Sequence, residues 1–500
     1  MAQQVAPSAQ IECTPASSAC DYAKHSYKAI VAQILMATLA LLVTAANGMT
    51  SGFPALLLPQ LEAENSTIPT TEEEGSWITS IHSIVTPIGS LMSGPIMEHL
   101  GRRTTLLVSI FPGIFGWICI ALSKSHLALL IGRSLTGMST GLSAPAALVL
   151  LGEMAEPRLR GLLAGAPSAS FSMGILLIYA LNSSLPWTLV AALSTILPLV
   201  ALVSLFCLPE SPLWLERVNK SDEALKAMTW LRGGSEAQAR KELALIKEQQ
   251  IHNRIIEEAH TSIGGRSRLL SRSVLRALLV VNVFNFFQVM GGTFTIIFYA
   301  VSVLRQASGG QVSDTNIAVV TALTRVLLTT IACFLLLKVG RRPLTISSGL
   351  GSGTAALILS WWLYWSPDFK GYDWVPSALV VIYVIFNSYG FFTIQALMIG
   401  ELFPAKARGF SSGVSCAVIN AVLFFTSKWY PWMTHVLQPH GLFLLFGLMT
   451  FAGTLFAYFF LPETKGRTLA EIEEHFSGSS LFWNNSRQIE RRENLIVNGQ

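Results

Sequence analysis

The side chains with the clearest capacity for chemistry are arginines and glutamates that occur twice, in the same order, once in each half of the chain. They lie in three pairs of short motifs: Gly101-Arg102-Arg103 and Gly340-Arg341-Arg342, Glu153 to Arg160-Gly161 and Glu401 to Arg408-Gly409, Pro209-Glu210-Ser211-Pro212 and Pro462-Glu463-Thr464-Lys465. The second pair has identical internal spacing. We infer that one unit has been duplicated. Parallel repeats of this kind in membranes enclose a site near the bilayer midplane, between the halves.

The chemistry available to these residues is reversible ion pairing at the ends of membrane spans. Partly buried pairs of this type are stronger than exposed ones, which contribute only ~0–1 kcal/mol. We expect the pairs to form in the conformation whose cytoplasmic side is closed and to separate in the other, so that they act as a gate. Charge anchoring at the membrane surface is the alternative for some of the arginines. The candidate gate residues are Glu98, Arg102, Arg103, Glu153, Arg160, Glu210, Arg341, Arg342, Glu401, Arg408 and Glu463.

Motifs for catalysis or nucleotide hydrolysis are missing. The chain contains no Gly-Lys dipeptide, which excludes a phosphate-binding loop of the Walker type, and no His-Glu-x-x-His motif. Its six cysteines show no metal-ligand spacing. We therefore expect no enzyme activity, no cofactor, no metal site and no ATP-driven pumping.

The acidic residues avoid the apolar runs. None lies between Asp21 and Glu62, between Glu98 and Glu153, or between Glu401 and Glu463, and the other spans follow the same pattern. Proton-coupled carriers usually need a buried carboxylate that exchanges its proton at accessible pH. This pattern favours downhill transport. His82 is the one titratable alternative, and a hydrogen-bonded structural role is open to it as well.

Arg325 is the exceptional charge inside a span. It precedes Gly340 by about four helical turns, or roughly 22 Å at 1.5 Å per residue, which places it well inside the bilayer. An arginine at that depth costs about 2.5–3.5 kcal/mol on insertion scales unless it is satisfied. A backbone carbonyl, Gln288, water or an anionic substrate could satisfy it. His82 and Arg133 are further candidates for contact with the substrate.

The elements that must position these residues are membrane helices. Of the 500 residues, 51% are hydrophobic and 13% charged, whereas an ordinary soluble protein has roughly 25% charged residues. The sequence contains twelve apolar runs that are long enough to cross a ~30 Å hydrocarbon core. They are 29–50, 77–97, 104–123, 127–149, 162–181, 187–207, 274–299, 317–337, 344–364, 376–399, 410–430 and 441–461.

The net charge of +5 matters less than its placement. The basic residues of the repeated motifs fall in loops on one side of these spans, which the positive-inside tendency assigns to the cytoplasm. An even number of spans then places both termini there, in a multi-pass protein of the plasma membrane. Asn65-Ser66-Thr67 lies in the first outer loop, so Asn65 is a candidate glycosylation site.

The predicted organisation is an N-terminal tail, two bundles of six spans joined by a linker, and a C-terminal tail. The Glu, Ala, Lys and Leu content of the linker favours helices, one beginning near Ser221 and a second from Ser235 onward. The boundaries are 1–28 for the cytoplasmic tail, 29–209 for the first bundle, 210–272 for the cytoplasmic helical linker, 273–461 for the second bundle and 462–500 for the second tail.

Several motifs resemble the sugar porter family of the major facilitator superfamily. They include the run from Gly94 to Arg103, Gly132-Arg133, Pro209-Glu210-Ser211-Pro212 and the run from Pro462 to Arg467. Finer details, such as Ala166-Pro167-Ser168 and Trp374-Val375-Pro376, are similar to insect facilitated trehalose transporters. The resemblance implies an all-α membrane protein of twelve transmembrane helices in two six-helix bundles, alternating between outward and inward openings around a central sugar site.

Departures from the family pattern concentrate where sugar should bind. The usual Gln-Gln-x-Ser-Gly-x-Asn of the seventh span keeps only Gln288, since Val289, Gly291 and Phe294 replace three polar residues. The usual Gly-Pro-x-Pro-Trp of the tenth span becomes the run from Phe392 to Ala396, and Leu337 replaces an expected acid. Arg325 stands where the family usually presents an amide. The candidate substrate ligands are Gln288, Thr293, Thr295, Arg325, Gln395 and Asn420.

Three functions are open on this basis. The leading one is a facilitative uniporter of hexose or trehalose working by alternating access, with a small-molecule sugar and the lipid bilayer as its partners and no nucleic acid. The second keeps the carrier but assigns it a small organic anion held by Arg325. The third is a sugar sensor that does not transport and signals through its tails.

Overall fold

The computed structural model describes residues 15–63, 66, 68–156, 159–182, 185–261, 272–303, 314–365, 374–403, 407–465 and 475–476, and gives only the backbone at 15–26, 160, 249–261, 272 and 314–315. The candidate glycosylation site Asn65 and the side chain of the candidate gate residue Arg160 lie outside this described part.

The N-terminal half consists of α1 to α8, and its helices end where the sequence supplies caps and breaks. The start of α3 is a capping box in which Thr71 accepts from the backbone of Glu74 and the Glu74 carboxylate accepts in return. Gly101, with φ of +94°, separates α3 from α4. The bounds are α1 Pro15–Gly52, α2 Pro54–Leu61, α3 Glu72–Leu100, α4 Arg102–Ala121, α5 His126–Met154, α6 Arg160–Asn182, α7 Trp187–Ser194 and α8 Ile196–Phe206.

The C-terminal half consists of α12 to α19 and repeats this arrangement with more breaks. The longest helix, α19, contains Gln438 with φ of 56°, so it is two helices joined at a kink. The bounds are α12 Arg272–Met290, α13 Thr295–Phe298, α15 Asp314–Lys338, α16 Arg341–Trp365, α17 Trp374–Asn387, the π-helix η2 Ser388–Phe392, α18 Thr393–Glu401 and α19 Arg408–Phe460.

The described helices supply the predicted spans. Nine stretches within the described residues are long and apolar enough to cross a membrane, with α1 and α2, α7 and α8, and α17 to α18 each forming one stretch. The kinked α19 holds two spans. The helices α3 and α16 have spanning length but are rich in serine, glycine and threonine. Together these make twelve.

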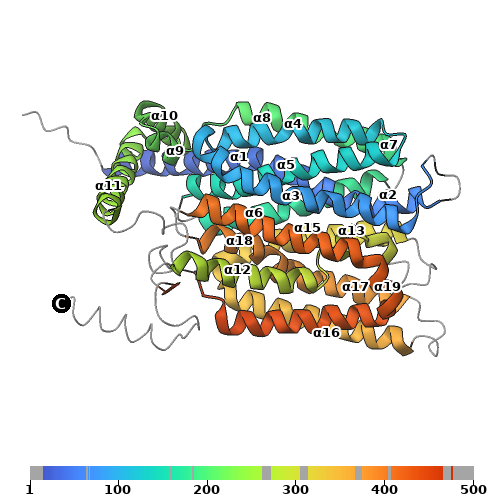
Figure 1. Cartoon of the computed structure of the whole chain (residues 1–500). Helices are drawn as coiled ribbons and strands as arrows, with labels where there is room; N and C mark the ends of the chain where they lie inside the picture. Colours follow the sequence, from blue (N-terminus) through green and yellow to red (C-terminus); the bar gives the residue numbers. More distant parts are fainter. Residues whose placement is uncertain are drawn as a thin grey trace, which may run out of the picture.

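The predicted linker helices are confirmed. After α9 (Pro212–Arg217), α10 covers Ser221–Leu231 and α11 covers Glu236–Thr261. All three stand beyond one end of the bundle, close to the start of α1 (Figure 1). We call this end the linker end. The opposite end, which carries α2, the start of α3 and the Gln438 kink, is the far end.

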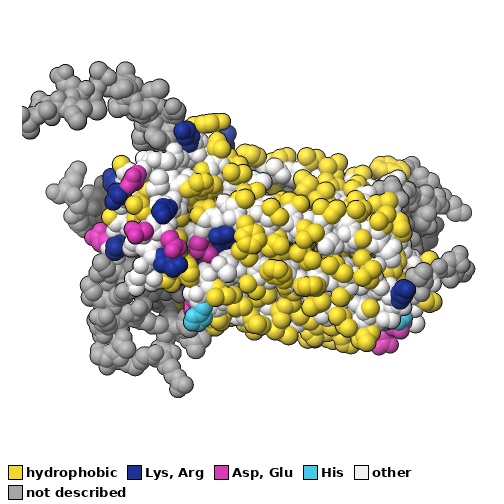
Figure 2. Space-filling view, turned by 90° about the horizontal axis from the view of Figure 1, so that it is seen from above, with side chains coloured by type: hydrophobic (Ala, Val, Ile, Leu, Met, Phe, Trp, Pro, Cys, Tyr) yellow, Lys and Arg dark blue, Asp and Glu magenta, His cyan; other side chains and the backbone are white. Residues whose placement is uncertain are grey.

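A broad apolar surface covers the middle of the face shown in Figure 2, and charged side chains gather mainly at the linker end. Large apolar side chains of the membrane helices, such as Phe115, Val203 and Trp361, are more than half exposed. A protein with so extensive an apolar surface would aggregate in water, whereas in a bilayer this surface contacts the hydrocarbon chains.

The two halves pack against each other mainly through α3 with α19 and α6 with α15. At the α3–α19 contact a Cβ atom on Gly413 would lie 2.6 Å from the Ser90 carbonyl oxygen, so the helices approach more closely than a larger residue permits.

Candidate functional site

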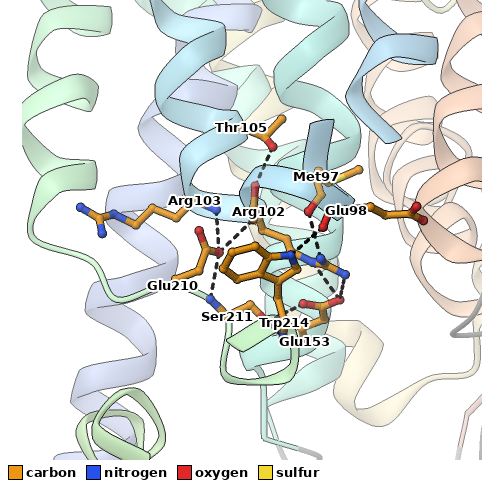
Figure 3. Close-up of polar contacts among 10 residues, drawn as sticks. Met97, Glu98, Arg102, Arg103, Thr105, Glu153, Glu210, Ser211 and Trp214 are labelled. Atoms are coloured by element: carbon orange, nitrogen blue, oxygen red, sulfur yellow. Dashed lines mark hydrogen bonds and ion pairs between the residues drawn. The ribbon is translucent and has the colours of Figure 1, made fainter. Parts of the chain in front are cut away.

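At the linker end of the N-terminal half, the repeated motifs build a compact polar cluster (Figure 3). The Glu210 carboxylate accepts hydrogen bonds from the backbone N–H groups of Arg102 at 2.8 Å and Arg103 at 2.9 Å, so it caps the N-terminus of α4. The Arg102 guanidinium pairs with Glu153 at 2.9 Å and donates to the Met97 carbonyl at 3.1 Å. These bonds join α3, α4, α5 and the start of the linker.

The C-terminal half repeats this cluster residue for residue. Glu463 accepts from the backbone N–H groups of Arg341 at 3.0 Å and Arg342 at 3.1 Å, which caps α16. Arg341 pairs with Glu401 at 2.8 Å and donates to the Leu336 carbonyl at 3.2 Å.

A hydroxyl completes each cluster in the same place. Ser211 donates to Glu153 at 2.5 Å, and Thr464 donates to Glu401 at 2.5 Å. The duplication read from the sequence is therefore also a duplication of hydrogen-bond geometry.

Both ion pairs lie inside one half rather than between the halves. Arg103 donates to the Leu205 carbonyl, and the Arg342 guanidinium lies 5.1 Å from the centre of the Tyr458 ring. The backbone carbonyl of Glu98 accepts from the Trp214 indole at 2.9 Å. The clusters thus fix the linker-end loops of each half, and their action as a gate between conformations stays a prediction.

The centre of the C-terminal half contains two interruptions of helical geometry. The seventh span breaks between α12 and α13, where Gly292 has φ of +88°. The tenth span passes through the π-helix η2, a local feature that is frequent at functional sites. The backbone N–H of Phe391 within η2 donates to the Ser348 hydroxyl at 2.9 Å, so a side chain of α16 provides an acceptor for a backbone group of the π-helix.

A buried polar group forms where these two breaks meet. The Asn387 amide donates to the Thr293 hydroxyl at 3.0 Å and lies 3.4 Å from the Tyr383 hydroxyl. Tyr383 donates in turn to the Gly291 carbonyl at 2.6 Å. Each of the three side chains is nine-tenths or more buried. Sequence reasoning predicted Thr293 but missed Asn387 and Tyr383, although an amide within an apolar run was a usable signal.

Arg325 lies against an aromatic ring of η2. Its guanidinium is 5.2 Å from the centre of the Phe392 ring. Phe392 also contacts Phe171 of α6, with ring centres 6.0 Å apart, so the contact reaches the N-terminal half. We call Thr293, Arg325, Tyr383, Asn387 and Phe392 the central cluster.

Several buried polar atoms at this depth have no hydrogen-bond partner among the described residues. They are both amide atoms of Gln288, Nη1 of Arg325 and Oδ1 of Asn387. Buried polar atoms are normally paired, and an unpaired one costs about 1–3 kcal/mol. A site that binds a polar ligand is one physical reason for such atoms to be retained.

The remaining predicted ligands lie elsewhere. Asn420 donates to the Cys416 carbonyl of its own helix at 2.8 Å. Thr295 lines a small cavity with Met290 and Tyr430, and Gln395 is buried in α18. Of the predicted ligands, Thr293 therefore bonds to Asn387 and Arg325 lies against the Phe392 ring, while none of the contacts described above joins Thr295, Gln395 or Asn420 to them.

Arg133, fully buried in α5, is satisfied by the backbone. It donates to the carbonyls of Thr50 at 2.6 Å, Ile78 at 3.2 Å and Thr79 at 3.5 Å. These bonds join α1, α3 and α5 and leave the guanidinium without need of a carboxylate.

Comparison with known proteins gives these features a context. The sequence profile of the family described as Sugar (and other) transporter matches residues 33–476. The chain belongs to this sugar transporter family. The members of this family are described as transporters and not as enzymes.

Similar curated proteins are named facilitated trehalose transporter Tret1. The one from Culex quinquefasciatus is 31% identical over 90% of this chain and 87% of its own length, and the one from Polypedilum vanderplanki is 32% identical over 91% and 89%. The chain spans only about half of some longer relatives, such as 55% of the Aedes aegypti protein.

The fold is that of the major facilitator superfamily, with twelve helices in two bundles. A solved structure of the proton:xylose symporter XylE bound to 6-bromo-6-deoxy-D-glucose has a TM-score of 0.73 at 20% identity, covering 88% of this chain and 98% of that one. An inward-open structure of the xylose transporter XylE from E. coli has a TM-score of 0.68.

Proposed function

We propose that this transporter is a facilitative uniporter that carries a hexose or trehalose across the plasma membrane by alternating access. The linker end faces the cytoplasm, together with both termini, and the N-terminal half rocks against the C-terminal half. The names of the Tret1 relatives support trehalose. The duplicated halves, which contact each other through Phe171 and Phe392 beside the central cluster, support the mechanism.

The observation that carries uniport is the satisfaction of Arg133 by three carbonyl oxygens. A buried arginine that needed a carboxylate partner would supply an ionisable pair for proton coupling. Here backbone carbonyl oxygens take the place of a carboxylate partner for Arg133, and the sequence places no acidic residue in the middle of a span.

The sugar would bind at the central cluster. Thr293 and Asn387 of this cluster, and the unpartnered amide of Gln288 on α12, offer hydrogen-bonding groups to sugar hydroxyls, each bond worth about 0.5–1.5 kcal/mol net. Thr295, Gln395 and Asn420 are further candidates that would have to move toward the ligand during closure. Phe392 and Phe171 present aromatic faces from the two halves to the apolar faces of a sugar ring.

The test is uptake of labelled trehalose, glucose and a panel of small carboxylates into proteoliposomes, with and without an imposed pH gradient. We expect sugar uptake whose rate does not change with the gradient. Uptake that accelerates in an inward proton gradient would contradict uniport, and carboxylate uptake without sugar uptake would contradict the sugar.

One observation favours a second candidate, transport of a small organic anion. The Nη1 atom of Arg325 is buried without a hydrogen-bond partner in the described part of the chain, and a carboxylate substrate would supply one.

Replacing Arg325 with Gln separates these two candidates. It should abolish anion uptake if the cargo is an anion, because the only positive charge at the central cluster is removed. Sugar uptake should instead continue at lower affinity. Arg325→Lys is the matched control, since it keeps the charge but loses the planar guanidinium.

A further inference from the structure

A second cavity lies between the two halves near the far end. It has a volume of about 200 Å³. The N-terminal half contributes Leu58 from α2 with Glu72 and Ser76 from α3, and the C-terminal half contributes Tyr299, Ser302 and Tyr430. We call it the far-end pocket. Because both halves line it, its shape depends on how they are placed relative to each other.

The walls of the pocket combine an aromatic face with hydrogen-bonding groups. Tyr299 and Tyr430 are stacked with ring centres 4.1 Å apart and planes inclined by 22°. The Tyr299 hydroxyl donates to the Ser427 carbonyl at 2.7 Å. The Tyr430 side chain is 3% exposed, and its hydroxyl has no hydrogen-bond partner among the described residues. A buried hydroxyl of this kind is a free group for a polar ligand.

Two carboxylates, Glu62 and Glu72, line the pocket, and each already has an interaction partner, which argues against a cation as ligand. Glu72 lies 3.0 Å from the His435 imidazole, and Ser76 accepts a hydrogen bond from the Lys428 ammonium at 2.8 Å. No group of three or more His, Cys, Asp or Glu side chains suited to a metal occurs in the described ranges. The chemistry that remains suits a neutral, polyhydroxylated molecule with an apolar face.

Tyr430 also connects the far-end pocket to the interior. The same side chain lines the small cavity that contains Thr295 and Met290. Tyr430 therefore stands between the far-end pocket and the region just beyond the break of the seventh span. A molecule in the far-end pocket is one side chain away from a predicted ligand of the central site.

We propose that the far-end pocket is a separate loading site that binds one pyranose ring before the sugar reaches the central cluster. The proposal rests on the proposed sugar transport. The tyrosine pair stacks on the ring, and the Tyr430 hydroxyl with the Ser76 and Ser302 hydroxyls bonds to its hydroxyl groups. Movement of Tyr430 then opens the way inward.

The test uses a cysteine introduced at Thr434, a partly exposed residue of the pocket wall. A membrane-impermeant thiol reagent is applied to the outside of intact cells, which the far end faces in the proposed topology. The unsubstituted protein measures background from the native cysteines. Glucose and trehalose should slow modification of Thr434→Cys several-fold. The protection should persist, at the same half-maximal sugar concentration, when Asn387→Ala weakens the central site in the same protein.

A second variant tests the ligand contact itself. Tyr430→Phe keeps the ring stack but removes the unpartnered hydroxyl, so the half-maximal sugar concentration for protection should rise by roughly 2- to 10-fold. Tyr364→Phe, at an exposed tyrosine of α16, is the control and should leave it unchanged.

The outcomes separate this site from the transport function. Protection that shifts with Asn387→Ala would show that occupancy of the central site is what shields Thr434, and would overturn the loading site. Absence of protection in both backgrounds would overturn it too. Protection in a protein that fails to transport sugar in proteoliposomes would retain the pocket and reject the proposed function.

Discussion

The physical problem at the residue scale is how polar groups survive inside the bilayer. Arg133 donates to three backbone carbonyl oxygens. The Asn387 amide donates to Thr293, while its Oδ1 atom has no hydrogen-bond partner in the described part. Arg325 uses the Phe392 ring, a cation–π contact worth more when it is desolvated. Arg133 is thus a structural arginine that fixes three helices, whereas Arg325 and Asn387 keep bonding capacity for a ligand.

Asn387→Ala should therefore weaken sugar binding more than it weakens the fold. The variant removes an amide whose Oδ1 is unpaired in the described part and which orients Thr293. We expect the KM for uptake in proteoliposomes to rise by roughly 2- to 10-fold. Thr354→Ala, at an exposed threonine that bonds only within its own helix, is the control. Equal KM values for Asn387→Ala and the unsubstituted protein would exclude Asn387 from the site.

The sequence predicted individual site residues only where the family pattern supplied a position. Thr293 and Arg325 were found in this way, and in the structure Thr293 bonds to Asn387 while Arg325 lies against Phe392. Asn387, Tyr383 and Phe392 were missed as site residues because the family pattern supplied no position for them. The π-helix η2, which begins directly after Asn387, was not predicted either. A π-helix adds a residue to a turn, and the local sequence carries no clear signal for it.

At the scale of the element, a carboxylate at each helix start has the same task in both halves. Glu210 caps α4 and Glu463 caps α16, and each accepts from two consecutive backbone N–H groups. Glu210→Gln and Glu463→Gln should each lower the Tm of the detergent-solubilised protein by roughly 1–4 °C, because the charge that complements the helix terminus is lost.

The geometry of the two caps is so similar that the two losses should also be similar. Glu223→Gln, at an exposed ion pair with Lys220, is the control and should shift the Tm little. A loss at only one of the two caps would contradict equivalent roles for the duplicated motifs.

The linker helices contain a pH-dependent element of their own. Arg232, at the end of α10, donates to Glu242 of α11 at 2.6 Å. Burial raises the pKa of Glu242, but the hydrogen bonds and charge of Arg232 outweigh it and leave the pKa below the ordinary value of 4.5. A lowered pKa in the folded state stabilises the contact above the ordinary value, and this stabilisation is lost as the pH falls through the folded value.

Hydrogen exchange measures this effect directly. At pH 7, Glu242→Gln should speed amide exchange in the first turns of α11 relative to the unsubstituted protein. The difference should shrink below pH 4.5, where protonation removes the same charge from the unsubstituted protein. A difference that is the same at pH 7 and pH 3 would contradict this role.

Most elements could be predicted from the sequence because the bilayer imposes a simple length rule on apolar runs. All twelve predicted runs correspond to helices, and the linker helices begin where the caps and composition indicated. The break within the seventh span, where Gly292 adopts a positive φ, was not predicted because a hydropathy pattern does not encode it. Gln438, the other kink residue, lies between the predicted runs 410–430 and 441–461.

At the scale of the whole molecule, the far end carries charged contacts that connect the two halves. The Lys428 ammonium of α19 donates to Ser76 of α3 and lies 4.2 Å from the centre of the Trp77 ring. His435 contacts Glu72 in the same region. The pairs at the linker end, in contrast, join helices of one half. The far-end contacts must break when the two halves separate there, so they favour the conformation that is closed at the far end.

Lys428→Met should shift the molecule toward opening at the far end. It keeps the length of the side chain but loses the ammonium, and with it a cation–π contact of about 0.5–2 kcal/mol. A cysteine at Ser302, in the wall of the far-end pocket, should then react roughly 2- to 30-fold faster with an impermeant thiol reagent. Trp77→Leu should produce a similar increase. The double variant should add little, because both substitutions remove one shared contact. Additive effects would show that Lys428 and Trp77 act independently, and an unchanged rate would mean that other contacts hold the far end closed.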